Sequence, residues 1–442
     1  MKHFTVGRTT RRALLQSAAA AAIGLAALSM PAASMAQDKP FAGSKLTYWG
    51  GLIFSDEANK LLTAAITAWG EANGVETEVV MINNNETVQK VSAAVASNSL
   101  PDALDVDVDL LLLLSRQGVF ADVSETYDRI GAAQGGWYAP VAATSDLIAS
   151  EVGRTGIPYG ATGNLILRRN DILEAAGFTA APATWDELAA QSAAVTNPPV
   201  FGMGLALSNV GDGNVQIAVM QSFGGRIAAD DGKTVTLKSD GTRAYLAWLK
   251  QAWDAGAFPP GVASWDGAGD NQAYLSGQAA FIANTGSVGI AAKGQDPELY
   301  AATGYSPLPA GPVMQVSPII LNFRAVPASG KNIEAAKALL EHLAQPEFTD
   351  AYYQAAIYGP VLNDQKRLKA FDGSDPIKSG LLNLVETGTA PAYPDVYNAA
   401  YAELYTTFII PKMAQRVVID GWCLDRAMDE AQAQAEAIYA KY

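Results

Sequence analysis

Three aspartates at alternating positions, Asp105, Asp107 and Asp109, are the residues whose types and spacing are best suited to chemistry. In an extended strand successive side chains point to opposite faces, so these carboxylates are expected to share one face. A buried parallel strand is apolar throughout, which places the acids at its carboxyl end, where open α/β sheets bind ligands. Three roles fit them: hydrogen bonding to a ligand, a solvated or structural role, and metal binding or acid–base catalysis by a carboxylate pair.

The rest of the chain offers little for catalysis. Cys423 is the single cysteine, so an intramolecular disulfide is excluded, and only His342 remains beyond the N-terminal segment that holds His3. Thiolate and imidazole catalysis are therefore disfavoured, and neither a metal site nor a cofactor is expected. The sequence contains no phosphate-binding loop and no nucleophile elbow, and Gly202-Met203-Gly204 lacks the third glycine of a dinucleotide loop.

The strand that carries the acids belongs to a predicted α/β unit with a parallel sheet. A helix is expected between Ser55, which could cap it, and Gly74, which ends it. The flanking elements follow in the order strand, strand, helix, strand, at residues 45–49, 75–82, 88–97 and 103–108. Connections this short between strands predict right-handed parallel crossovers.

A second α/β stretch begins near Gly156. Thr184 and Glu187 have the spacing of a capping box, which predicts a helix start between them. Residues 110–114 predict a buried helix start, and residues 307–312 form a proline-rich connector. Helices are also expected around Tyr245 to Trp253, at 335–343 and at 422–439.

Residues 1–36 have the features of a cleaved export signal. Arg11 and Arg12 end a basic segment, an apolar run extends from Ala18 to Leu28, and Ser34-Met35-Ala36 offers small residues to a signal peptidase. The pattern resembles a twin-arginine signal, with an ordinary Sec signal as the alternative. The apolar run is too short for a membrane-spanning anchor, which needs about 20 residues.

The charge balance disfavours nucleic acid and anionic lipid as partners. The chain holds 30 Lys and Arg against 44 Asp and Glu, a net charge of −14, and removal of the four basic residues of the signal leaves −18. Such a surface repels polyanions. No cysteine lies near Ala36 for lipid attachment, so a free soluble protein in the periplasm of a Gram-negative bacterium is expected. Its length suits two lobes.

Taken in order, short segments of the chain resemble the extracellular solute-binding proteins of ABC importers, in the large family that includes maltose-binding protein. The resemblance covers roughly residues 44–440. Its most telling stretches are Thr184 to Leu188, within the matching segment 182–188, and Leu275 to Ala280, within the segment 274–281. The other matching segments are residues 46–51, 100–102, 118–123, 156–160, 169–171, 176–177, 307–312 and 332–343.

This resemblance implies a two-lobed α/β fold that closes around a ligand, each lobe a mainly parallel sheet flanked by helices. The N-terminal lobe would comprise residues 37–160 and 311–372, and the C-terminal lobe residues 161–310 and 373–442. The chain would cross between the lobes near residues 160–163, 307–312 and 371–376.

The resemblance also implies a set of ligand-binding residues. Asp109 matches a family carboxylate that binds sugar hydroxyls, while Thr162 replaces an acidic residue of the family, which argues against a maltodextrin ligand. Trp265 and Tyr358 are expected to replace a stacking tryptophan that is missing after Asn284. The full set is Trp49, Gly51, Phe54, Asp107, Asp109, Tyr159, Thr162, Asp212, Asn214, Trp265, Asn284, Gly286, Ser287 and Tyr358.

The predicted function is capture of a sugar or sugar-like polyol and its delivery to an ABC transporter permease by a monomeric binding protein. Aromatic faces would meet the apolar side of the sugar ring, and planar polar groups its hydroxyls. A polyamine is the alternative ligand, because acids and aromatics also enclose cations. An exported carbohydrate-active enzyme that uses Asp105, Asp107 or Asp109 is the alternative from another class.

Overall fold

Two β-sheets organise the part of the chain that the computed structural model describes, residues 39–53 and 55–442. The predicted export signal and Phe54 lie outside these residues. Residues Phe41–Tyr442 form one unit. Its strands are β1 (Lys45–Leu52), β2 (Glu76–Asn83), β3 (Ala103–Asp107), β4 (Gly156–Gly163), β5 (Leu165–Arg169), β6 (Phe201–Gly204), β7 (Ala279–Asn284), β8 (Thr303–Pro307) and β9 (Ile319–Ala325).

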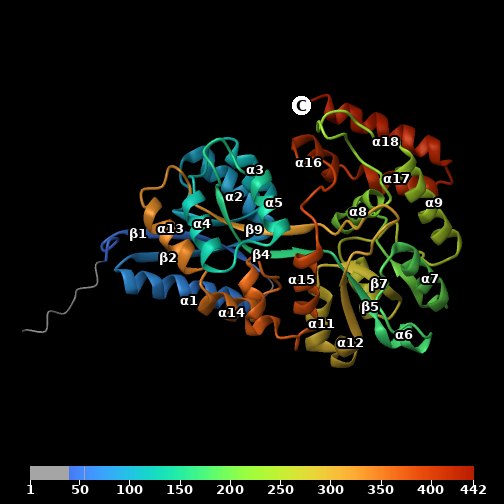
Figure 1. The fold of residues 1–442 in the computed structure, drawn as a ribbon, viewed down its shortest axis with the longest axis horizontal. Helices are drawn as coiled ribbons and strands as arrows, with labels where there is room; N and C mark the ends of the chain where they lie inside the picture. The colour runs from blue at the N-terminus through green and yellow to red at the C-terminus, as the bar shows by residue number, and fades with distance from the viewer. Residues whose placement is uncertain (1–38, 54) are drawn as a thin grey trace, which may run out of the picture. The chain divides into compact units, whose positions relative to one another are not determined.

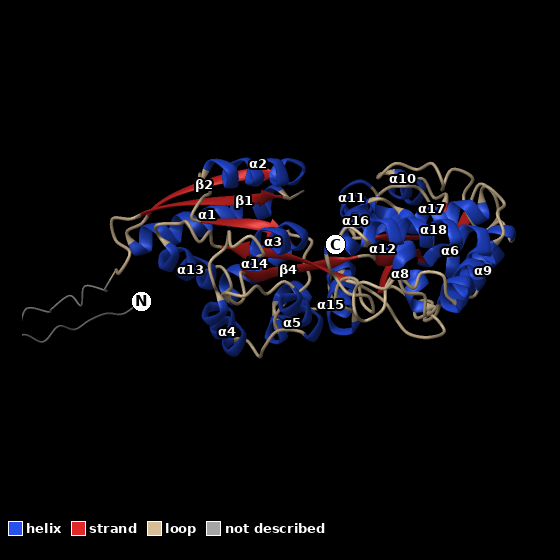
Figure 2. Ribbon diagram, turned by 90° about the horizontal axis from the view of Figure 1, so that it is seen from above, coloured by secondary structure: helices blue, strands red, loops and turns tan. Residues whose placement is uncertain are grey.

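Helices flank both sheets, and Figure 2 shows α2 on one side of β1 and β2 and α13 on the other. The helices are α1 (Asp56–Asn73), α2 (Asn84–Ser97), α3 (Val108–Ser115), α4 (Ser124–Ala133), α5 (Ala139–Leu147), α6 (Asn170–Ala175), α7 (Trp185–Val195), α8 (Val215–Ser222), α9 (Asp240–Asp254), α10 (Gly269–Leu275), α11 (Ser287–Gln295), α12 (Pro297–Ala302), α13 (Ile333–His342), α14 (Pro346–Ala355), α15 (Pro376–Thr387), α16 (Ala399–Thr406), α17 (Ile409–Val418) and α18 (Leu424–Tyr439). Three short 3-10 helices are η1 (Gly211–Asn214), η2 (Asn363–Arg367) and η3 (Lys369–Phe371). None of the described helices is long and apolar enough to cross a membrane.

The predicted helix boundaries follow from local capping. The Ser55 side chain accepts a hydrogen bond from the backbone of Ala58, and Gly74 ends α1 with a left-handed φ of 70°. Thr184 caps α7 by accepting from the amide of Glu187 at 3.1 Å. The Glu187 carboxylate in turn accepts from the Ala183 amide at 2.7 Å, one residue before the cap, so the box is shifted but reciprocal.

The five-stranded sheet has the order β2-β1-β3-β9-β4, and the four-stranded sheet the order β6-β7-β5-β8. The predicted parallel crossovers are confirmed, because β1 pairs in parallel with both β2 and β3. Strand β9 lies between β3 and β4, far from both in sequence (Figure 1).

The expectation that each sheet is mainly parallel is wrong. Strand β9 is antiparallel to β3 and β4, and β5 is antiparallel to β7 and β8. The path of the chain explains this. It leaves the first sheet along β4 and enters the second along β5, with Asn164 alone between them. It returns to the first sheet along β8 and then β9. Strand β9 therefore runs opposite to its neighbour β4, and β8 runs opposite to its neighbour β5.

The alternating aspartates do not share one extended strand, which corrects the first expectation. Strand β3 ends at Asp107, and α3 begins at Val108. The Asp107 carboxylate accepts a hydrogen bond of 2.8 Å from the Leu110 amide and so caps the helix. Asp109 therefore lies in the first helical turn, and the helix predicted at residues 110–114 is present but begins two residues earlier, at Val108. Asp107 and Asp109 do lie at the carboxyl end of β3, whereas Asp105 lies within the strand.

Candidate functional site

A cavity of about 290 Å³ lies where the two sheets exchange chain segments. Asp109 reaches it from α3, after β3 of the first sheet, while Asn214 and Gln221 come from η1 and α8, after β6 of the second. Asn164, the single residue between β4 and β5, also lines it, as does Ile320 at the start of β9. Its volume is close to the lower end of the range for ligand pockets, about 300–1,000 Å³.

Three tyrosines spaced by four residues line the cavity. Tyr401 and Tyr405 lie on α16, which Asn398 caps by accepting a 2.9 Å hydrogen bond from the Tyr401 amide. The ring centroids of Tyr397 and Tyr401 are 6.0 Å apart, and those of Tyr401 and Tyr405 are 6.5 Å apart. Tyr405 is 39% exposed and the other two are buried. The rings of Tyr401 and Tyr405 are stacked, whereas those of Tyr397 and Tyr401 are tilted. Aromatic faces suit the apolar face of a cyclic ligand. The predicted ligand contacts do not include these tyrosines, although their spacing of four residues places side chains on one face of a helix.

Asp109 is the one carboxylate among the residues that line the cavity. No described residue forms a hydrogen bond or an ion pair with it. Its surroundings raise its pKa to about 6, first through loss of hydration in the cleft and then through the negative charge of Asp107. Asp107 itself caps α3 and does not line the cavity. Of the predicted acids, Asp109 is thus the one placed to meet a ligand.

A second carboxylate, Asp212, lies close to the same region. Partial burial and then the charge of Asp270 raise its pKa to about 6. The charges of Asp109 and Asp212 both contribute to raising the pKa of Tyr405, so the two acids approach one phenol from different elements. Asn214, at the end of η1, donates a 3.2 Å hydrogen bond to the backbone oxygen of Tyr405.

The predicted segment Asn284 to Ser287 forms a turn whose polar groups satisfy one another. The Asn284 side-chain amide donates to Asp270 at 3.0 Å and to Asn271 at 2.8 Å. Its oxygen accepts from the Gly286 amide and the Ser287 hydroxyl, both at 3.1 Å. Gly286 has a φ of 98°, which an L side chain would strain. These residues therefore support α11 and do not line the cavity.

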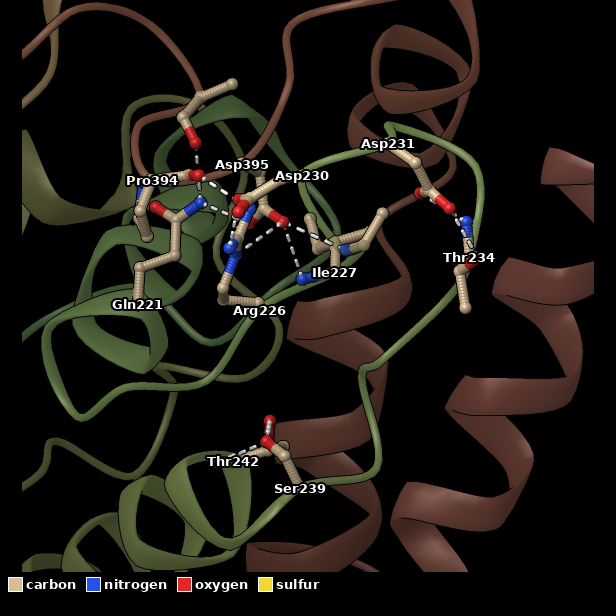
Figure 3. A network of polar contacts seen from close by, with 12 residues as sticks. Gln221, Arg226, Ile227, Asp230, Asp231, Thr234, Ser239, Thr242, Pro394 and Asp395 are labelled. Carbon is tan, nitrogen blue, oxygen red and sulfur yellow. Dashed lines mark hydrogen bonds and ion pairs between the residues drawn. The ribbon is translucent and has the colours of Figure 1, made fainter.

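Gln221 is held in the cavity wall by a buried polar network (Figure 3). Its amide nitrogen donates to Asp395 at 2.8 Å and to the backbone oxygen of Ala392 at 3.0 Å. Asp395 also accepts from the backbone amides of Ile227 at 3.0 Å and Ala228 at 2.9 Å. Burial raises the pKa of Asp395, and these hydrogen bonds oppose that shift. The network fixes the segment before α16 against α8.

Tyr159 and Tyr358 lie in the core, not in the cavity, which corrects their predicted role as ligand contacts. Their ring centroids are 5.5 Å apart in an edge-on arrangement, and the buried guanidinium of Arg324 lies 4.2 Å from the Tyr159 centroid. A Cβ on Gly160 would come within 2.6 Å of the Tyr358 ring. Rings packed this closely against a buried cation enclose it rather than a ligand.

The residues predicted around β1 are also structural. The Gly51 amide donates to Asp105 at 2.9 Å, and Asp105 is buried against the Tyr48 hydroxyl and Arg324. Asp105 is therefore the structural acid of the three. Trp49 is partly buried against the core, and neither it nor Gly51 lines the cavity.

Trp265 and Thr162 do not line the cavity. Trp265 lines a separate open groove of about 510 Å³ along α10 and packs against Gly269, so it is not in the tyrosine-lined cavity. Thr162 on β4 pairs with Ile320, which does line it. Among the predicted residues, the structure thus brings Asp109 and Asn214 into the cavity, with Asp212 close by.

No group of three or more His, Cys, Asp or Glu side chains within the described ranges could hold a metal ion. Cys423 is exposed, and burial lowers the pKa of His342.

A family model for bacterial extracellular solute-binding proteins matches residues 64–376. A protein of Brucella abortus strain 2308 that is named as a binding protein is 24% identical over 278 residues, which cover 61% of this chain and 64% of that relative. A Brucella suis biovar 1 protein with a similar name matches with the same values. The match thus spans just under two thirds of the curated relatives' length.

Solved structures with the same architecture cover nearly the whole described chain. The sugar-binding protein MalE of Xanthomonas citri superposes with a TM-score of 0.75 at 18% identity, over 90% of this chain and 98% of its own. Maltose-bound MalE3 of T. maritima gives 0.71 at 17% identity, over 89% and 100%. A sugar transporter of Arthrobacter chlorophenolicus with bound laminaribiose gives 0.70 at 16% identity, over 89% and 99%. At these identities the likeness shows the fold, and the predicted two-lobed α/β architecture is confirmed.

Proposed function

The chain belongs to the bacterial extracellular solute-binding proteins, and we propose that it captures a sugar or sugar-like polyol between its two lobes and delivers it to the permease of an ABC importer. The observation that carries this proposal is one cavity lined by Tyr397, Tyr401 and Tyr405, by three side-chain amides and by Asp109. Aromatic faces suit the apolar side of a sugar ring, and planar polar groups suit its hydroxyls. The sugar-binding proteins with the same fold support the ligand class.

We place the ligand between Asp109 on one side and Asn214, Gln221 and Tyr405 on the other. The proposed lobes are residues 37–160 with 311–372 and residues 161–310 with 373–442. The single residue between β4 and β5, Asn164, supports the first proposed crossing, and the connection from β8 to β9 the second. Because residues on the cavity wall come from both sheets, closure of the lobes would enclose the ligand.

The proposed location is the periplasm of a Gram-negative bacterium, reached through a twin-arginine signal in residues 1–36, with the mature protein acting as a monomer. The description of the family as extracellular supports a site of action outside the cytoplasm. Replacement of Arg11 and Arg12 by lysines in the intact precursor tests the route. Loss of export supports the twin-arginine pathway, whereas unchanged export indicates a Sec signal.

A thermal-shift screen with mono- and disaccharides and polyols tests the function. A ligand at a hundred times its dissociation constant stabilises the folded state by about 2.7 kcal/mol, which raises the melting temperature by several degrees. A shift with a carbohydrate supports the proposal. No shift with any member of the panel contradicts the assignment of a sugar ligand.

A further inference from the structure

Most of the cavity lining is apolar. Eleven of its nineteen residues have aliphatic side chains, which come from α3, α8, β9 and α16 and from the segments next to β8, β9 and α16. Three more form the tyrosine stripe, Tyr397, Tyr401 and Tyr405. The remaining five have a carboxylate, amide or hydroxyl group. A ligand with a hydroxyl on every side would therefore bring more polar groups into the cavity than its lining can pair.

Two of the five polar side chains, Asn214 and Gln221, have no group left for a ligand. Their amide nitrogens are occupied by the hydrogen bonds described above. Their side-chain oxygens have no accessible surface and lie against the hydroxyls of Tyr405 and Tyr401. The polar side chains that remain for the hydroxyls of a ligand are those of Asp109, Asn164 and Thr406.

Ile320 places an exposed apolar side chain in this cavity. On β9 its neighbours Ile319 and Leu321 are fully buried, whereas Ile320 points to the opposite face of the strand and is 43% exposed. Pro318 lies two residues before it, on the same side of the chain, and is half-buried in the lining. An aliphatic side chain at a position open to solvent is unusual for a strand that has one buried face.

A second segment extends the apolar surface beside Ile320. Pro318 forms a parallel bridge with Thr389, and the Ile319 amide donates to the Thr389 carbonyl at 2.9 Å. This register places Pro391, two residues beyond Thr389, beside Ile320, and Pro391 also lines the cavity. Pro318, Ile320 and Pro391 thus form one apolar wall. Their side chains offer no hydrogen bond, so a hydroxyl held against them would lose water without gaining a partner. A methyl or aryl group would instead gain from burial there.

We infer that the ligand presents an apolar substituent, and not a further hydroxyl, to the apolar wall. This inference rests on the proposed binding function of the same cavity and specifies its ligand further. The chemistry is that of a sugar with one apolar substituent, either a deoxy sugar or a glycoside with an alkyl or aryl aglycone. The cavity volume of about 290 Å³ suits a ligand of this small size.

Isothermal titration with matched pairs of probes tests this inference. The free sugars are 6-deoxyglucose against glucose, L-fucose against L-galactose and L-rhamnose against L-mannose. Phenyl β-glucoside against methyl β-glucoside tests a glycoside as the source of the apolar group, and 2-phenylethanol is the probe without a sugar ring. We expect the more apolar member of a pair to bind about tenfold more tightly, the usual discrimination for one small group in an apolar pocket. Its binding should also have the more negative heat-capacity change.

Ile320→Thr tests the wall, because it keeps a β-branched side chain on β9 and replaces an apolar group by a hydroxyl. We expect it to reduce the preference to within about twofold, since the apolar substituent then meets a polar group. Ile320→Val keeps the wall apolar and should retain a preference of at least about threefold. Ile419→Thr makes the same change at an exposed residue after α17, outside the cavity, and should retain the full preference. Circular dichroism and melting curves check that the variants fold.

The possible outcomes separate the inference from the proposed function. Tighter binding of the deoxy sugars or of the phenyl glucoside supports both, and the pair that responds identifies the source of the apolar group. Binding of 2-phenylethanol alone supports the inference while contradicting a sugar ligand. Equal or tighter binding of the more hydroxylated sugars overturns the inference and leaves the proposed function standing. If no probe binds, both fail. A preference that persists undiminished in Ile320→Thr also overturns the inference, because the apolar group would then lie elsewhere.

Discussion

Asp109, which we propose as a ligand contact, carries a cost to the folded state. Its pKa rises from 3.8 to about 6 on folding, so the folded protein binds this proton more tightly than the unfolded chain does. Stability therefore falls as the pH rises through this interval and stays reduced above it. Asp109 is exposed and has no partner among the described residues, so its carboxylate is free to meet a ligand.

Asp109→Asn tests this cost directly. The variant has no proton to lose, so without ligand it should melt at a higher temperature than the wild type at pH 7.5 and at nearly the same temperature at pH 4. Differential scanning calorimetry across this range measures the effect. A lower melting temperature of the variant at pH 7.5 would show that the carboxylate supports the fold.

Tyr405 is the exposed member of the tyrosine stripe, and its ring should contribute to affinity with little effect on the fold. Tyr405→Ala removes a partly exposed ring and should weaken ligand binding about tenfold, since contacts with aromatic rings contribute about 0.5–2 kcal/mol. Tyr405→Phe keeps the ring and should bind within about threefold of the wild type. If the Phe variant loses as much affinity as the Ala variant, the hydroxyl and not the ring contacts the ligand.

At the level of elements, Asp395 connects the segment before α16 to α8. Its buried carboxylate accepts three hydrogen bonds, from Gln221 and from the amides of Ile227 and Ala228. Asp395→Ala would leave these buried donors short of a partner, so the free energy of unfolding should fall by about 2–4 kcal/mol. Affinity should fall as well, because Gln221 and α16 both line the cavity. Urea unfolding and titration of the same sample measure both effects. A loss of stability without a loss of affinity would show that the Asp395 network stabilises the fold but does not hold the cavity wall in a binding conformation.

Local signals predicted the elements better than they predicted the site. Ser55, Gly74 and Thr184 act within a few residues, so their caps follow from the sequence. The boundary between β3 and α3 was missed because alternating acids and valines fit a strand, while Asp107 in fact caps the helix. Tyr405 and Asp109 line one cavity although they are far apart in the sequence, and only the path of the chain through both sheets brings them together. No spacing within one segment carries that information.

At the level of the whole molecule, the chain crosses between the two sheets beside the cavity. The chain passes from β4 to β5 and returns from β8 to β9, and both Asn164, between β4 and β5, and Ile320, at the start of β9, line the cavity. A ligand bound there contacts the segments about which the lobes would move. Binding energy can therefore favour the closed state, in proportion to the difference in affinity between the two states.

A carrier must release its ligand unchanged, which distinguishes it from an enzyme. The surroundings of Asp109 and Asp212 raise the pKa of each to about 6, and general acid–base catalysis uses acids of this kind. The two carboxylates therefore make hydrolysis of a bound sugar a reaction to test. The family and the proteins of the same fold are binding proteins, and His342 lies on α13 outside the cavity. We therefore expect prolonged incubation with a disaccharide that the protein binds to return the intact disaccharide, bound at one equivalent per chain, as measured by mass spectrometry. Accumulation of monosaccharide that Asp109→Asn abolishes would instead assign the carboxylate to hydrolysis and replace the carrier by an exported carbohydrate-active enzyme.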